Sequence, residues 1–151
     1  MCLISLPQVQ EVFPADFSEL NAVAEYLPLD ANSACTPFTG MVCNINACSN
    51  GHADKGDLNL CVVVPFGYWD DGELVLYQLG VAVKLQPLDI IIFDSKEMIH
   101  FNMPYKGLRG SLVMNTDKTL QGYRTDLNGW KDKNFKTNMF SWTQARTTTM
   151  S

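Results

Sequence analysis

The spacing of hydrophobic and polar residues divides the chain into a short helical start and a long β-rich middle. Between residues 13 and 27, apolar side chains recur at helical spacing and form a single stripe. Asp16 is expected to cap this helix, with Glu19 as the return partner of a capping box and Pro28 as its stop. The residues of the stripe are Phe17, Leu20, Val23, Ala24 and Leu27.

From residue 37 onward the pattern changes to short apolar or alternating runs, which are typical of strands. Turn sequences such as Ser49-Asn50-Gly51 and Asp70-Asp71-Gly72 separate these runs. Many short strands with no helix between them predict an all-β sandwich or barrel. Beyond about residue 117 the chain becomes polar and irregular. The predicted strand runs are 38–46, 58–66, 73–78, 80–86, 89–94, 98–103 and 108–115.

Composition narrows the class of protein. A chain of 151 residues with 46% hydrophobic residues can bury one core but not two. No stretch approaches the ~20 apolar residues of a membrane helix, and no basic segment precedes the short apolar run at the start. Five cysteines without a C-x-x-C pair indicate reduced thiols. We therefore expect an intracellular protein without a membrane span.

The net charge of −5 hides a division along the chain. Residues 1–100 contain three basic and thirteen acidic residues, a net charge of −10. Residues 101–151 contain eight basic and three acidic residues, a net charge of +5. Such asymmetry is typical of a basic surface that meets a polyanion, although a solvated tail explains it equally well.

The two histidines carry the clearest chemistry. In a strand, residues two apart point to one face, so the imidazole of His52 and the carboxylate of Asp54 would project together. Alternation places His100 on one face with Met98 and Asn102. If the strands wind as a barrel, His100 returns close to the first pair. Two imidazoles and one carboxylate form a facial ligand set for iron(II) that leaves three positions open.

One strand farther along, the chain offers a site for an anion. Arg109 and Ser111 share a face of the predicted strand 108–115. A guanidinium with a neighbouring hydroxyl suits a terminal carboxylate, which it holds by charge-assisted bidentate hydrogen bonds. Asn44 and Asn46, which also share a face, could bind the same ligand or form a strand-end turn. A metal site beside an anion clamp is what a bidentate 2-oxo acid requires.

The order H-x-D, His, R-x-S resembles the iron(II)- and 2-oxoglutarate-dependent dioxygenases, and within them the TET/JBP-like group that is expanded in fungi. The resemblance covers about residues 37–115. Asp71-Gly72 stands where the family usually has Gly-Gly, and Leu88 stands at the glycine of its Pro-Gly-Asp turn. The segments that carry the resemblance are Asn44-Ile45-Asn46, His52-Ala53-Asp54-Lys55-Gly56-Asp57, Asp71-Gly72-Glu73-Leu74-Val75-Leu76, Val83-Lys84-Leu85-Gln86-Pro87-Leu88-Asp89-Ile90-Ile91-Ile92-Phe93-Asp94 and Ile99-His100-Phe101-Asn102.

The resemblance implies an all-β core with an N-terminal helix, folded as a double-stranded β-helix (a jelly-roll, cupin-like barrel). The core would span residues 37–117, between a helical lead-in at 1–36 and a basic extension at 118–151. The family's ligands would be iron(II) at the two-histidine, one-aspartate set and 2-oxoglutarate at the arginine–serine pair, with dioxygen at the remaining position. In this sequence the metal ligands would be His52, Asp54 and His100, and the co-substrate residues would be Arg109 and Ser111, with Asn46 as a further candidate.

The implied activity is hydroxylation of a substrate C–H bond while 2-oxoglutarate is converted to succinate. In the TET/JBP-like group the substrate is the methyl of 5-methylcytosine or thymine, flipped out of DNA. We would then expect a nuclear protein whose basic C-terminal region, with Lys131, Lys133 and Lys136, contacts DNA. The segment Phe66-Gly67-Tyr68-Trp69 could stack on the base. The alternatives are a protein or small-molecule hydroxylase on the same barrel, or a degenerate, non-catalytic fragment.

Overall fold

The structure, a computed structural model, describes residues 6–27 and 34–126. The chain divides into two compact units, residues 1–118 and 119–151. The second unit includes α3 (Gln121–Asp126), and a 3-10 helix, Lys118–Leu120, spans the boundary. Within the described ranges, no helix is both long and apolar enough to cross a membrane. The first unit contains every predicted site residue that the structure describes.

Two helices precede the strands. α1 (Leu6–Val12) was not indicated by the apolar pattern, whereas α2 (Pro14–Ala24) lies within the predicted range 13–27. The predicted capping box is wrong. Phe13 occupies the N-cap without a side-chain cap, and Asp16 lies in the first turn, where its charge suits the helix dipole. The Glu19 carboxylate instead accepts a hydrogen bond from Asn59 Nδ2 at 3.2 Å, which ties α2 to the segment entering the sheet.

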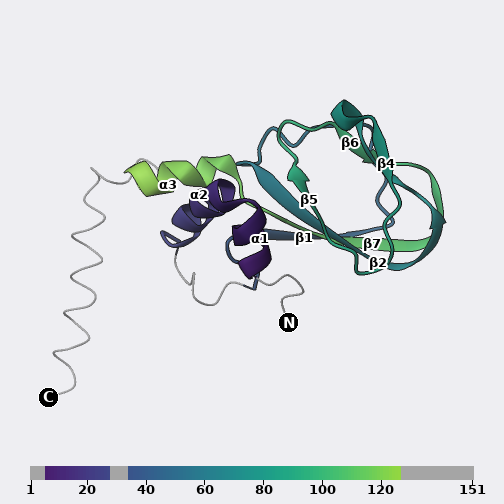
Figure 1. The fold of residues 1–151 in the computed structure, drawn as a ribbon, viewed down its shortest axis with the longest axis horizontal. Coiled ribbons are helices and arrows are strands. Elements are labelled where there is room, and N and C mark those ends of the chain that lie inside the picture. Colours follow the sequence, from purple (N-terminus) through teal and green to yellow (C-terminus); the bar gives the residue numbers. More distant parts are fainter. Residues whose placement is uncertain (1–5, 28–33, 127–151) are drawn as a thin grey trace, which may run out of the picture. The chain divides into compact units, whose positions relative to one another are not determined.

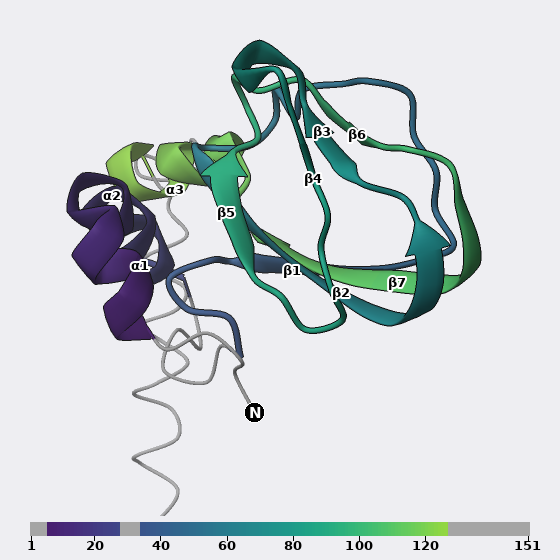
Figure 2. The ribbon, with the colours of Figure 1, turned by 45° about the vertical axis from the view of Figure 1, so that its right-hand side comes forward.

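In the described part of the chain, seven antiparallel strands form two facing sheets, as Figures 1 and 2 show. Each strand corresponds to one of the seven predicted runs, so the prediction of a β-rich core is confirmed, in the arrangement of a β-sandwich or jelly-roll. The four-stranded sheet has the order β1 (Gly40–Ile45), β7 (Tyr105–Asn115), β2 (Leu60–Asp71), β5 (Ile91–Asp94). The three-stranded sheet has the order β4 (Val81–Val83), β3 (Leu74–Leu76), β6 (His100–Asn102).

The long antiparallel pair of β2 and β7 organises the four-stranded sheet. Its register runs from Val62 opposite Met114 to Asp71 opposite Tyr105. β2 continues past the predicted end at residue 66, and β7 begins before the predicted start at residue 108. Gly67 and Gly107 lie inside these strands rather than at their ends. Gly107 has a φ of 117°, and a Cβ there would collide with the backbone of β2. The glycine therefore permits close approach of the two strands rather than ending one of them.

The hydrophobic core lies between the sheets. Its buried members come from both sheets and from the loop after β4, and Val63 and Val113 pack against them. Alternation along β2 turns Val62 and Val64 to the opposite face of the sheet, where they are also buried. The core members are Cys61, Leu74, Leu76, Leu85 and Phe93.

Asp71 and Leu88 have a left-handed backbone conformation. The φ angle is 65° at Asp71 and 72° at Leu88. Aspartate tolerates this region, whereas leucine is strained there because its Cβ crowds the carbonyl oxygen. The turn is held in place by the Leu88 N–H, which donates to Pro65 O at 2.7 Å.

Candidate metal centre

The two histidines meet at the free edge of β6. The backbone N–H of His100 donates to His52 O at 2.9 Å, and the N–H of His52 donates to His100 O at 3.2 Å. This contact is an isolated bridge, and Ala53 and Asp54 continue as loop. The prediction that His52-Ala53-Asp54 forms a strand is therefore wrong. Gly51 before the segment and the turn at Lys55-Gly56 leave room for only one bridged residue.

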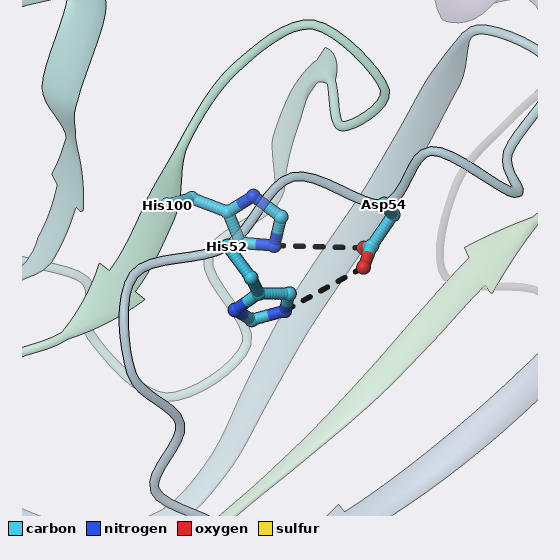
Figure 3. A group of neighbouring side chains, drawn as sticks. All are labelled: His52, Asp54 and His100. Carbon is cyan, nitrogen blue, oxygen red and sulfur yellow. Dashed lines mark ion pairs between the residues drawn. The ribbon is translucent and has the colours of Figure 1, made fainter.

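The three predicted ligands nevertheless converge, as Figure 3 shows. His52 Nε2 lies 3.5 Å from one oxygen of Asp54, and His100 Nε2 lies 3.6 Å from the other. One donor atom from each residue fits within a group whose members are all within 4.8 Å of one another. Two imidazole nitrogens and a carboxylate oxygen at this spacing can hold one metal ion.

Both imidazoles are oriented by their second nitrogen. His52 Nδ1 lies 2.8 Å from Asn50 O, and His100 Nδ1 lies 3.0 Å from Met98 O. A carbonyl oxygen only accepts, so each Nδ1 is the donor in this contact, and each Nε2 is the nitrogen that faces Asp54 and is placed to bind a metal. Backbone carbonyls fix metal-binding histidines in this way. The donor set thus fits the facial triad of iron(II) in chemistry as well as in position.

The cluster is open on one side. The side chains of His52 and Asp54 are 44% and 38% exposed, whereas that of His100 is 13% exposed. The ring of Phe93 packs edge-on against His100, with centroids 5.0 Å apart. The core therefore supports one histidine, while the side chains of His52 and Asp54 are accessible to solvent.

A cavity of about 590 Å³ lies between the sheets and joins the metal cluster to the predicted anion site. All three predicted metal ligands line it, as do Arg109 and Ser111. Alternation along β7 explains the placement of the last two, since they lie two apart in a continuous strand. The structure therefore brings the metal-ligand set and the arginine–serine pair to one space.

Arg109 is 6% exposed, and its Nε and Nη1 atoms are buried without a hydrogen-bond partner. The guanidinium lies over the rings of Trp69 and Tyr105, at 5.3 and 5.6 Å from their centroids. Burial lowers the pKa of Arg109, against an opposite effect of nearby Tyr105 and Cys48. A buried cation with free donors is costly unless an anion completes it. Arg109 therefore has the properties of a receptor for a carboxylate.

Asn46, which the sequence suggested as a co-substrate residue, contacts the backbone of Arg109. The Asn46 N–H donates to Arg109 O at 2.8 Å, and its Oδ1 accepts from the Arg109 N–H at 3.0 Å. Its φ of 48° turns the chain out of β1. Asn46 is absent from the cavity lining, whereas Asn44, opposite Ser111 in register, is present.

The structure also describes two aromatic side chains of the segment that was expected to stack on a base. Phe66 packs over Gly110, and Tyr68 is 72% exposed on the strand surface. Asn102 was not singled out as a site residue, yet it lines the cavity with its Oδ1 buried and without a partner. Its position two residues after His100 was the available signal. The basic residues Lys131, Lys133 and Lys136 lie outside the described residues.

Comparison with known proteins identifies a solved structure with a similar fold. The chain matches no protein-family model and no curated protein sequence. It is similar to the solved structure of NgTET1 in complex with 5mC DNA, with a TM-score of 0.58 and 20% sequence identity. The match covers 74% of this chain and 48% of that chain, so this chain spans about half the length of its solved relative. At this level of identity the likeness shows the fold.

Proposed function

We propose that the protein is an iron(II)- and 2-oxoglutarate-dependent dioxygenase built on a double-stranded β-helix. One observation carries the proposal: a cluster of two histidines and one aspartate shares a cavity with a buried arginine whose Nε and Nη1 have no partner. The first group of residues suits iron(II), and the second suits the distal carboxylate of a 2-oxo acid. The likeness of the fold to NgTET1 supports the same assignment.

The proposed site residues have two roles, metal binding and binding of the 2-oxo acid. His52, Asp54 and His100 would hold iron(II), which when bound supplies the activation of dioxygen that the protein's own side chains cannot provide. Arg109 and Ser111 would bind the distal carboxylate and so fix the orientation of the 2-oxo acid. Burial of Arg109 excludes water from this contact, which strengthens its charge-assisted hydrogen bonds. The resulting reaction would consume one dioxygen, convert 2-oxoglutarate to succinate and CO2, and hydroxylate a substrate C–H bond, with one oxygen atom going to succinate and the other to the substrate.

For the substrate we propose the methyl of 5-methylcytosine or thymine in DNA. NgTET1 was solved with 5mC DNA, and the C-terminal 51 residues of this chain carry a net charge of +5. A basic segment supplies the phosphate contacts on which DNA affinity depends. The exposed side of the metal cluster, at His52 and Asp54, provides access for a base flipped out of the duplex. An enzyme with this substrate would act in the nucleus.

The test is succinate formation from 2-oxoglutarate by protein loaded anaerobically with iron(II) and then exposed to air. Reactions run without DNA, with unmethylated DNA, which contains thymine as the only methylated base, and with the same sequence containing 5-methylcytosine. His100→Ala removes one ligand, and Asp89→Ala, which removes an exposed turn carboxylate, is the matched control. Hydroxylated bases are measured in the same samples.

Succinate that depends on His100, with a hydroxylated base, supports both parts of the proposal. Succinate that depends on His100 but leaves DNA unchanged retains the oxygenase and assigns it a protein or small-molecule substrate instead. Absence of succinate from metal-loaded protein with every DNA would contradict the enzymatic proposal and favour a non-catalytic shell.

A further inference from the structure

Asp57 is a carboxylate buried in the lining of the same cavity. It is 5% exposed, and both of its oxygens accept hydrogen bonds. Ser95 Oγ donates to Oδ2 at 2.5 Å, and Asn115 Nδ2 donates to Oδ1 at 2.7 Å. The donors come from separate places in the fold, since Ser95 follows β5 and Asn115 ends β7. Asp57 therefore joins the loop after Asp54 to two strands of the four-stranded sheet.

The same residues hold the backbone of Asp54. The Asp54 N–H donates to Ser95 O at 2.8 Å, and the Asp57 N–H donates to Asp54 O at 2.8 Å. Ser95, which is fully buried, thus binds Asp54 through its carbonyl and Asp57 through its hydroxyl. Both polar groups of the Asp54 peptide backbone are attached to this network. The network is defined here as Asp57, Ser95 and Asn115.

Asp54 depends on such a network because strand pairing does not hold it. It lies in loop, and its side chain is 38% exposed. His52 has its bridge to His100, and His100 lies in β6, so each histidine has support from the sheet. The carboxylate ligand has the Asp57 network in place of that support.

We propose that Asp57 is the positioning residue of the metal centre, which sets the Asp54 carboxylate against the two histidines. This inference rests on the proposed function. A carboxylate buried at this depth is stable only with its hydrogen bonds made, and among the described residues no cation forms an ion pair with it. Loss of the Asp57 carboxylate would free the side chains of Ser95 and Asn115. The loop would keep its backbone bridge at Asp57 and Asp117 but lose its side-chain attachment, so Asp54 could turn toward solvent.

The test is Co(II) binding, followed by the visible ligand-field spectrum of Co(II), in protein without any co-substrate. Asp57→Ala removes both acceptor oxygens. Asp57→Asn keeps the shape, since its oxygen can accept from Asn115 while its amide donates to a reoriented Ser95 hydroxyl. Ser95→Ala removes the hydroxyl but keeps the carbonyl that holds Asp54.

Two control variants separate positioning from general stability. Val62→Ala opens a cavity on the face of β2 opposite the metal centre, so it lowers the melting temperature without touching the loop. Asp89→Ala removes a carboxylate that also accepts a backbone hydrogen bond, at the turn after β4. Both controls are expected to bind Co(II) as the wild type does.

The expected result is a 10- to 100-fold loss of Co(II) affinity in Asp57→Ala, roughly the effect of removing an outer-shell partner of a metal ligand. Its spectrum at saturating Co(II) should differ from that of the wild type, because Asp54 no longer coordinates in the same way. Asp57→Asn should restore the affinity to within about threefold and restore the wild-type spectrum. Ser95→Ala should fall between the two.

Wild-type affinity and spectrum in folded Asp57→Ala would overturn the inference and leave the proposed function standing. Equal losses in Val62→Ala would also overturn it, because metal binding would then follow stability alone. If Asp57→Ala does not fold, Ser95→Ala decides between the same outcomes. Wild-type protein that binds no Co(II) and no iron(II) would overturn the proposed function itself and the inference with it.

Discussion

The three proposed metal ligands and the Arg109–Ser111 pair line one cavity, but they belong to different kinds of backbone structure. Arg109 and Ser111 belong to β7, which is paired on both sides, with β1 and with β2. Asp54 lies in a loop, and His52 is held by a single bridge at the edge of the smaller sheet. The anion side, defined as Arg109 and Ser111, is thus part of the four-stranded sheet. The metal side, defined as His52, Asp54 and His100, is assembled from a loop and the edge of the three-stranded sheet.

The difference also appears in burial and in unmet hydrogen bonds. Arg109 is buried with two free nitrogens, so this side is costly until an anion binds. On the metal side His52 and Asp54 are partly exposed, and water can solvate them before a cation arrives. We infer that the arrangement of His52, Asp54 and His100 is easily disturbed. The Arg109–Ser111 pair is held rigidly, but burial of Arg109 lowers the stability of the ligand-free protein.

The largest expected effect is on the metal side. His100→Ala removes one of three ligands and the most buried of them, so iron(II) affinity should fall by at least roughly 100-fold. Equilibrium dialysis against iron(II) under anaerobic conditions measures it. The backbone bridge to His52 survives the change, so far-ultraviolet circular dichroism should stay that of the wild type. Unchanged iron binding would remove His100 from the site.

The second effect separates the two sides. Arg109→Leu should weaken 2-oxoglutarate binding by roughly 100-fold, or about 3 kcal/mol, because a charge-assisted bidentate contact is lost. Iron(II) affinity should stay unchanged. Arg109→Lys should recover only part of the binding, since an ammonium lacks the planar fork. Calorimetric titration of both ligands checks this, and a parallel loss of iron(II) binding would show that the two sides are not separate.

The same substitution should stabilise the protein when no ligand is present. Arg109→Leu removes two buried donors without partners, so the free energy of unfolding should rise by about 1–2 kcal/mol. Urea unfolding of the ligand-free protein measures this change. With a redox-inert divalent metal already bound to both proteins, 2-oxoglutarate should add stability to the wild type and much less to Arg109→Leu. A loss of stability in ligand-free Arg109→Leu would mean that the guanidinium is already satisfied.

A smaller effect is expected at the support of the anion side. Asn46→Ala removes the acceptor of the Arg109 N–H and places alanine at a φ of 48°. We expect a loss of about 1–2 kcal/mol in unfolding free energy. The affinity for 2-oxoglutarate should drop several-fold, because the strand under Arg109 is less firmly held. Asn46→Gly tolerates the backbone angle and separates strain from the lost hydrogen bond.

The smallest effect appears only in alkali. Burial raises the pKa of Cys61, in β2, from 9.0 to about 12. The folded state therefore favours the neutral thiol. The contribution of Cys61 to the free energy of unfolding is fully present below pH 9 and is lost as the pH rises from 9 toward 12. At pH 10 the loss should be about 1 kcal/mol. Cys61→Ala should show a shallower decline in urea unfolding over that range, and an identical slope would contradict the burial.

The sequence predicted which candidate residues lie close together better than it predicted the secondary structure to which they belong. Alternation holds for Arg109 and Ser111 because β7 is a regular strand. Strand alternation does not hold for His52 and Asp54, because Asp54 lies in a loop. Hydrogen bonds to residues far away in the sequence bring the two side chains together. Asn46 and Asn44 were also indistinguishable, because nothing in the pattern marks the left-handed turn that ends β1.

The inclusion of Asp57 in a network also depends on long-range contacts. Its partners Ser95 and Asn115 lie 38 and 58 residues away, and neither forms a motif with it. Nothing in the sequence around Asp57 distinguishes it from a solvated loop acid. Burial settles its environment, since the structure places Asp57 at 5% exposure. The roles of residues 127–151 stay predictions.

The most direct test of the account is the visible charge-transfer absorption of iron(II) chelated by 2-oxoglutarate. The protein is loaded with iron(II) without oxygen, and 2-oxoglutarate is then titrated. The account predicts that a band develops to saturation in the wild type, that His100→Ala abolishes it, and that Arg109→Leu moves its midpoint to roughly 100-fold higher 2-oxoglutarate. Absence of the band from wild-type protein that has bound iron(II) would contradict the claim that the two sides form one site.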